Sequence, residues 1–155
     1  MKRYLLWAAV PLALWYMLPR SCGRIDMPED VAKAYASLPD QIDFNRDVKR
    51  ILSDKCFSCH GPDAKKQKAD LRLDIASFAY DKATESGRKA IRPGDASASE
   101  VAHRILSTDP DYRMPTPESH LELSAYEKAV LLKWMDQCGL YSAPWSIHLS
   151  STAFS

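Results

Sequence analysis

The chain has 155 residues, of which 46% are hydrophobic and 26% are charged, and its 21 basic side chains almost balance its 20 acidic ones. That length allows one domain of ordinary size in addition to a targeting segment. Because the charge is near neutral, and the sequence has neither an arginine-rich stripe nor a helix-turn-helix pattern, we do not expect nucleic-acid binding.

Residues 1–21 are typical of a secretory signal peptide. Lys2 and Arg3 precede an uncharged run at 4–18, and small residues follow at 21–23. The run has 15 residues, whereas about 20 are needed to cross a bilayer. A cleaved signal is therefore favoured over an uncleaved membrane anchor, and we expect the rest of the chain to be periplasmic or otherwise exported.

A cysteine directly after the apolar run raises a second question about the N-terminus. Cys22 stands where a bacterial lipoprotein carries its lipid, but Pro19 and Arg20 occupy positions where small or aliphatic residues are usual. Lipidation of Cys22 and an ordinary signal-peptide cysteine both stay open. Contact with a membrane is expected only through such a lipid or through a retained signal anchor.

The remaining chain divides into a spacer at 22–41, one domain at 42–139 and a tail at 140–155. The spacer is polar, contains two prolines and is compatible with one short helix. The domain is expected to begin with a helix that runs into a pair of cysteines, because apolar residues recur at helical spacing and Asp43 or Asn45 can cap its start. The apolar residues are Phe44, Val48, Ile51 and Leu52.

The long segment at 61–96 is expected to be a loop with one helical turn near 75–80. Two more helices are expected after it. The first of them begins at Ser97, with Glu100 completing a capping box. Prolines break the segment that follows it, and the last helix begins with another capping box at Ser124. Its apolar face is predicted to contain Tyr126, Val130, Leu131, Trp134 and Met135.

These patterns predict an all-α fold, a small bundle of three to five short helices with long loops. The sequence has no alternation long enough to predict a strand. Loops longer than about 12–15 residues in a compact domain are usually functional or disordered. A large buried prosthetic group would explain such loops, because they would wrap around it.

The sequence CFSCH at 56–60 is compatible with three kinds of site that share a CxxC spacing. A structural zinc site needs further ligands at suitable spacing. The remaining cysteines and histidines do not supply that spacing; they are Cys22, Cys138, His103, His120 and His148. A thioredoxin-like dithiol would follow a strand, whereas a helix is expected to lead into this motif. Zinc and dithiol chemistry are both disfavoured.

Covalent haem is the favoured interpretation of the motif. On one helical turn, positions i, i+3 and i+4 share a face, so Cys56 and Cys59 can form thioethers to two vinyl groups while His60 binds the iron. Haem c is attached outside the cytoplasmic membrane, which agrees with the expected export. We therefore predict one covalent haem c in a cytochrome c-like bundle, with His60 as the proximal iron ligand.

The second axial ligand of a haem c iron is normally Met or His. Met114 lies in a loop pinned by prolines, RMPTP at 113–117, whereas Met135 falls on the apolar face of the last helix and is expected in the core. Met114 is therefore the predicted distal ligand, with His120 as the reserve candidate. His103 is expected to be an ordinary packing or surface residue.

Three segments resemble, in order, the Planctomycete-type cytochrome c domain, which is a class I-like c-type cytochrome. They are IDFNRDVKRILSDKCFSCHGPDAKKQKADLRLD, RPGDASASEVAHRI and DPDYRMPTPESHLELSAYEKAVLLKWMDQ. The likeness runs over residues 42–137. The family's attachment motif and its Met-Pro loop fall on Cys56, Cys59, His60, Met114 and Pro115. This resemblance implies an electron-transfer haem c domain in an exported protein.

The end of the chain departs from the resemblance. Proteins of this family often carry further domains, and their last helix usually ends in a Gly-Ala turn, for which this chain has CGLYSAPWSIHLSSTAFS. Such a tail is either a natural short ending or the mark of a truncated or frameshifted piece of a larger protein. We expect Cys138 to be a lone thiol without a bridge to Cys22.

The expected function is one-electron transfer with redox partner proteins outside the cytoplasmic membrane, and not catalysis. Arg72 and Arg92 are candidate partners of the haem propionates, because a guanidinium binds a carboxylate bidentately; surface arginines are the alternative. Lysines at 65, 66 and 68 form either a docking patch for an acidic partner or a solvated charge run. The alternative functions are a peroxidase-like haem enzyme with a labile Met114, and a haem sensing or structural module.

Overall fold

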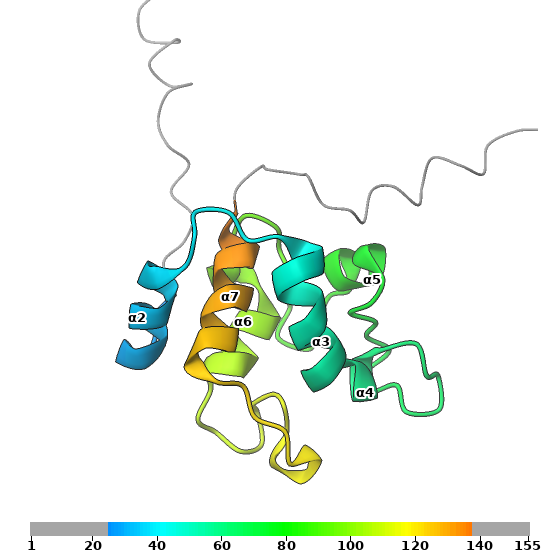
Figure 1. Cartoon of the computed structure of the whole chain (residues 1–155). Helices are drawn as coiled ribbons and strands as arrows, with labels where there is room; N and C mark the ends of the chain where they lie inside the picture. The colour runs from blue at the N-terminus through cyan, green and yellow to red at the C-terminus, as the bar shows by residue number, and fades with distance from the viewer. Residues whose placement is uncertain (1–24, 138–155) are drawn as a thin grey trace, which may run out of the picture.

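The structure is a computed structural model that describes residues 25–137 (Figure 1). In this part of the chain the helices are α2 (Glu29–Ser37), α3 (Lys49–Lys55), α4 (Phe57–His60), α5 (Ala76–Asp81), α6 (Glu100–Leu106) and α7 (Ala125–Asp136). A π-helical turn at Phe44–Val48 and 3₁₀ turns at Ala96–Ala98 and Pro117–Ser119 complete the elements. No strand forms among these residues, apart from two isolated bridges that involve Lys89. The predicted all-α class is confirmed.

Long loops connect the short helices, as the sequence predicts. They lie between α4 and α5, between α5 and α6, and between α6 and α7. The single helical turn predicted near 75–80 is present as α5. In Figure 1 the α6–α7 loop, drawn in yellow, and α4 lie toward the same end of the molecule.

Helix α7 is the central element of the core. Its capping box is confirmed: the Ser124 hydroxyl accepts from the Glu127 N–H at 3.2 Å, and the Glu127 carboxylate accepts from the Ser124 N–H at 2.8 Å. The buried residues of α7 are Ala129, Val130, Leu131, Leu132 and Met135. Tyr126 was predicted on this apolar face, and that prediction is wrong: its side chain is 57% exposed, because it lies in the first turn, before the helix enters the core.

Helix α2 packs along α7 (Figure 1). Val31 and Leu38 are buried. The Tyr35 hydroxyl donates to the Asp136 carboxylate at 3.1 Å, and the Lys133 ammonium donates to the Leu38 carbonyl at 3.0 Å. This packing joins part of the predicted spacer to the core of the domain.

The helix predicted from Phe44 onwards forms, but in two parts. Asp43 caps its start by accepting from the Arg46 N–H at 2.8 Å, and the first turn is π-helical before α3 continues it. Val48, Ile51 and Leu52 are buried, as their spacing predicts. The ring of Phe44 lies 5.6 Å from that of Trp134 on α7, so this helix and α7 share one apolar interface.

The predicted capping box of Ser97 and Glu100 is wrong. Asp95 starts the turn instead, accepting from the Ala98 N–H at 3.0 Å, and α6 begins only at Glu100. The Ser97 hydroxyl donates to the Asp95 carboxylate at 2.6 Å. The Glu100 side chain is 2% exposed, because other side chains bind its carboxylate inside the protein.

Several predictions concern residues outside 25–137. The signal peptide, the lipid on Cys22, the lone thiol of Cys138, the tail at 140–155 and His148 all lie outside the described residues. Within 25–137, no helix is both long enough and apolar enough to cross a membrane.

Candidate functional site

The CFSCH motif forms one tight helical turn. The chain leaves α3 at Cys56, whose φ of −123° breaks the helix, and α4 follows directly. The N–H groups of Cys59 and His60 both donate to the Cys56 carbonyl, at 3.1 and 2.8 Å. Cys56 and Cys59 are both free cysteines. Because residues three and four apart share a helix face, this turn places both thiols and the imidazole on one side.

The loop after α4 returns to the same turn and holds its C-terminal end. The Lys68 N–H donates to the Cys59 carbonyl at 2.9 Å, and the Leu73 N–H donates to the His60 carbonyl at 2.8 Å. Carbonyls at the end of a helix have no partner within the helix, so this loop satisfies them. The loop thus fixes the backbone that carries Cys59 and His60.

Gly61 is required where this loop begins. A Cβ at this position would lie 2.4 Å from the Phe57 carbonyl oxygen and 2.7 Å from the Phe57 Cβ. The backbone after His60 therefore passes too close to α4 for any side chain. The glycine that follows the motif belongs to the geometry of the site.

The surroundings of the turn keep the Cys56 thiol and the His60 imidazole neutral. Burial raises the pKa of Cys56 to about 12, and the charges of Cys59 and Glu127 act in the same direction. Burial lowers the pKa of His60; contacts with the backbone of Leu71 and Lys68 oppose this effect, and the charge of Arg104 adds to it. His60 is therefore a neutral imidazole with a lone pair available to a metal.

His60 also has an unsatisfied atom. Its Nδ1 is buried and has no partner at hydrogen-bonding geometry, although a buried polar group without a partner costs about 1–3 kcal/mol. Two thiols and a neutral, incompletely satisfied imidazole on one turn are the donor set that a covalently attached haem uses. These residues therefore fit a haem c.

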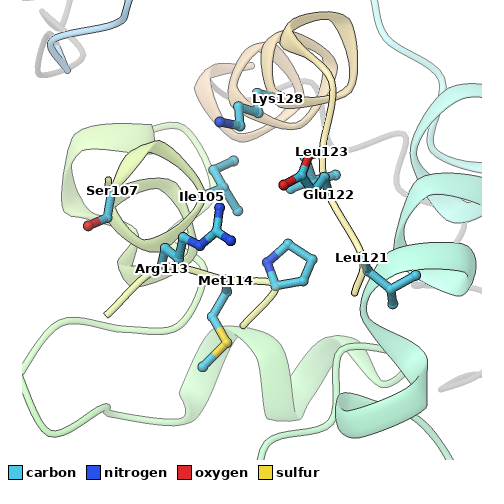
Figure 2. A pocket seen from close by; sticks show the side chains of 9 residues that line it. Ile105, Ser107, Arg113, Met114, Leu121, Glu122, Leu123 and Lys128 are labelled. Carbon is cyan, nitrogen blue, oxygen red and sulfur yellow. The ribbon is translucent and has the colours of Figure 1, made fainter. Parts of the chain in front are cut away.

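Met114 lies on the loop between α6 and α7. Its N–H donates to the Arg104 carbonyl at 3.0 Å, and its partly buried side chain lines a pocket of about 120 Å³. Figure 2 shows the Met114 thioether extending away from Lys128 on α7. The pocket is lined by Ile105, Ser107, Arg113, Met114, Pro115, Leu121, Glu122, Leu123 and Lys128. Met135, by contrast, is 2% exposed and belongs to the core.

The remaining candidates are the two arginines predicted to bind the propionates and two histidines. Arg72 is paired bidentately with Asp74, with 2.7 Å from its Nε to Oδ1, so a propionate would have to compete with that carboxylate. Arg92 is exposed. His120 is exposed at the end of the 3₁₀ turn, and His103 Nε2 lies 2.8 Å from the Ser97 carbonyl. The propionate role of both arginines stays a prediction.

Sequence reasoning missed one polar cluster near this loop. Glu100 had been assigned to a helix cap, and Arg104 and Tyr112 had no role. In the structure the Arg104 guanidinium and the Tyr112 hydroxyl both donate to the Glu100 carboxylate, at 2.9 and 2.8 Å. The i, i+4 spacing of Glu100 and Arg104 was the available signal, because oppositely charged residues at that spacing are neighbours on a helix.

An all-α domain with a CxxCH turn of this kind is typical of the haem-binding domains of c-type cytochromes. The family model of Planctomycete cytochrome C matches residues 56–118. That range contains both cysteines of the motif, His60 and Met114, and it confirms the resemblance. No curated protein and no solved structure matches the chain.

Proposed function

We propose that this protein is an exported one-electron carrier, with one haem c attached through Cys56 and Cys59 and bound axially by His60 and Met114. The observation that supports this proposal most strongly is the CFSCH turn. It has two free thiols and a partly buried, neutral imidazole whose Nδ1 is buried and unpartnered. A bound haem c supplies an iron that exchanges one electron between its ferric and ferrous states.

The protein's first task is to hold the proximal ligand. His60 sits at the end of α4, and its carbonyl is held by the Leu73 N–H of the returning loop. Because burial lowers its pKa, the imidazole does not lose its lone pair to a proton at neutral pH. The two thioethers would fix this turn against the porphyrin, so that His60 keeps one orientation in both redox states.

The distal ligand would be the Met114 thioether. A Met ligand raises the haem potential, so Met114 would poise this carrier for relatively oxidising partners. The Met114 N–H is tied to α6 through the Arg104 carbonyl, and Pro115 and Pro117 stiffen the chain that follows. Such a loop presents the thioether at a small entropy cost.

Apolar side chains from two helices would exclude water from the site. Val48, Leu52 and Val130 are each no more than 1% exposed, and Phe44 and Trp134 pack against this core. An apolar surrounding disfavours the more highly charged state of a centre. This wall therefore favours the ferrous state in addition to the effect of Met114.

The redox partner would dock on an exposed basic segment. Lys65, Lys66 and Lys68 are all exposed on the loop that follows the motif. Lys66 forms an exposed ion pair with Asp63, with 3.8 Å between the ammonium and the carboxylate. Positive charge close to the attachment site would steer an acidic partner toward the haem. Export places the carrier and its partner outside the cytoplasmic membrane, where haem c is attached.

The proposal is tested by the absorption spectra of the wild type and Met114→Ala, both expressed with haem c maturation. The wild type should be low-spin and show the weak long-wavelength band of Met-ligated ferric haem. The variant should lose that band and bind small exogenous ligands readily. A five-coordinate wild-type spectrum would contradict electron transfer with two fixed axial ligands and would favour a catalytic or sensing role.

A further inference from the structure

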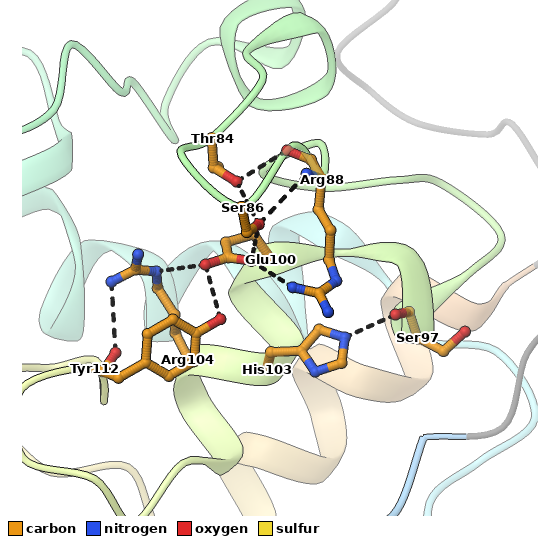
Figure 3. A network of polar contacts seen from close by, with 8 residues as sticks. All are labelled: Thr84, Ser86, Arg88, Ser97, Glu100, His103, Arg104 and Tyr112. Atoms are coloured by element: carbon orange, nitrogen blue, oxygen red, sulfur yellow. Dashed lines mark hydrogen bonds and ion pairs between the residues drawn. The ribbon is translucent and has the colours of Figure 1, made fainter.

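Glu100 is a charged side chain buried at the start of α6, and its carboxylate has four donors. The Glu100 side chain is 2% exposed. Figure 3 shows the donors gathered around it. They are Ser86 Oγ at 2.6 Å, Tyr112 Oη at 2.8 Å, Arg104 Nε at 2.9 Å and Arg88 Nη1 at 3.3 Å. Hydrogen bonds to charged groups are among the stronger ones in proteins, so this cluster ties separate segments of the chain firmly together.

Two members of this cluster reach the loop that carries Met114. The Arg104 guanidinium carbon lies 4.5 Å from the centre of the Tyr112 ring, and Arg104 Nη1 lies 3.5 Å from the Tyr112 carbonyl (Figure 3). The backbone of the same arginine accepts from the Met114 N–H at 3.0 Å. Tyr112 is thus held through its hydroxyl, its ring and its carbonyl, two residues before the thioether.

We infer that Glu100, Arg104 and Tyr112 form a positioning cluster that holds the Met114 loop against α6 and so keeps the thioether at the iron. This inference rests on the proposed function, because it presupposes Met114 as the distal ligand. None of the three residues is itself a ligand. They act by reducing the freedom of the loop, and they determine how readily another ligand displaces the methionine.

The Tyr112 hydroxyl is the most informative contact to remove. Its loss leaves the ring over Arg104 in place and leaves three donors on Glu100, so the fold should persist. Hydrogen bonds to charged groups are stronger than those between neutral groups. If this contact stabilises only the Met-bound loop, its removal should ease displacement of Met114 by about tenfold or more.

The experiment measures imidazole binding to the ferric holoprotein for the wild type, Tyr112→Phe and Met114→Ala. Tyr126→Phe is the matched control, because Tyr126 is 57% exposed and lies outside the positioning cluster. Tyr112→Phe should bind imidazole about tenfold more tightly than the wild type and show a weaker Met-ligation band. Its midpoint potential should fall, and Tyr126→Phe should behave as the wild type does.

Glu100→Gln provides a second variant, because it keeps the size of the side chain and removes its charge. It should shift imidazole affinity in the same direction as Tyr112→Phe. The inference is overturned if both variants unfold at lower temperature yet keep the wild-type imidazole affinity, because the cluster would then be structural only. A wild type that binds imidazole as readily as Met114→Ala would overturn the distal ligation itself, which separates the two failures.

Discussion

The CFSCH turn shows how single residues determine the chemistry of this protein. The imidazole is partly buried, its Nδ1 lacks a partner, and burial lowers its pKa. Cys56 is held as a neutral thiol by the same burial. The backbone of this turn is fixed on one side by the returning loop and on the other by Gly61, where no side chain fits. Small changes here should therefore be costly.

Gly61→Ala should destabilise the protein, because the new Cβ would overlap the carbonyl of Phe57, the first residue of α4. Overpacking of this kind typically costs about 1–3 kcal/mol. Denaturant unfolding of the holoprotein measures the change in the free energy of unfolding. Ser58→Ala is the control, since Ser58 is exposed on the same turn. Equal stability of Gly61→Ala and the wild type would show that α4 yields to the added methyl group.

Single residues also show where sequence patterns fail. Glu100 satisfies the spacing of a capping box with Ser97, yet its carboxylate binds Ser86, Arg88, Arg104 and Tyr112 instead. Three of these donors, Ser86, Arg88 and Tyr112, lie 12 to 14 residues from Glu100 in the sequence, and a local pattern contains no information about them. The haem motif was predictable because all of its chemistry lies within five consecutive residues.

Among the elements, α2 and α7 form a contact that the sequence did not reveal. Residues 29–37 read as part of a spacer, because two prolines flank a short and largely polar segment. In the structure α2 lies along α7, and Tyr35 donates to Asp136. Burial raises the pKa of Tyr35 to about 12, with Asp136 acting in the same direction. The contact therefore stabilises the protein only while Tyr35 keeps its proton.

This contact predicts a loss of stability at high pH. The pKa of Tyr35 rises from 10.0 to about 12 on folding, so its contribution is fully present below pH 10 and is lost as the pH rises toward 12. Denaturant unfolding of the wild type at about pH 9 and about pH 11 should show this loss. Tyr35→Phe should show a smaller loss between the same two values.

Tyr126→Phe is the control for this titration, because its ring is exposed. It should lose as much stability as the wild type between the two pH values. If Tyr35→Phe loses just as much, Tyr35 does not carry the effect, and the packing of α2 on α7 is independent of its hydroxyl proton.

The helix before the motif and α7 were predictable from their apolar spacing and their caps. Asp43 starts the helix before the motif, and Ser124 with Glu127 starts α7. The break at Cys56 was not predictable, because the helical pattern continues through it. Tyr126 was misplaced for a related reason: spacing identifies a face of a helix, but not the point along the helix at which that face enters the core.

At the scale of the whole molecule, the six short helices within residues 25–137 are joined by loops that local patterns left unassigned. The structure shows that these loops are tied to the elements that carry the candidate ligands. The loop after α4 binds the carbonyls of Cys59 and His60, and the loop after α6 binds the Arg104 carbonyl through Met114. The loops after α4 and α6 are therefore candidate parts of the site, and a haem held between them would complete the domain.

The attachment of that haem is tested most directly on mature protein purified from a host that makes haem c. Acidic organic solvent should leave the pigment on the polypeptide, and the intact mass should exceed that of the chain by one haem. Replacement of both Cys56 and Cys59 by alanine should release the pigment into the solvent. Colourless wild-type protein, or wild-type pigment that extracts as easily as that of the double variant, would contradict a thioether-bound haem on this turn.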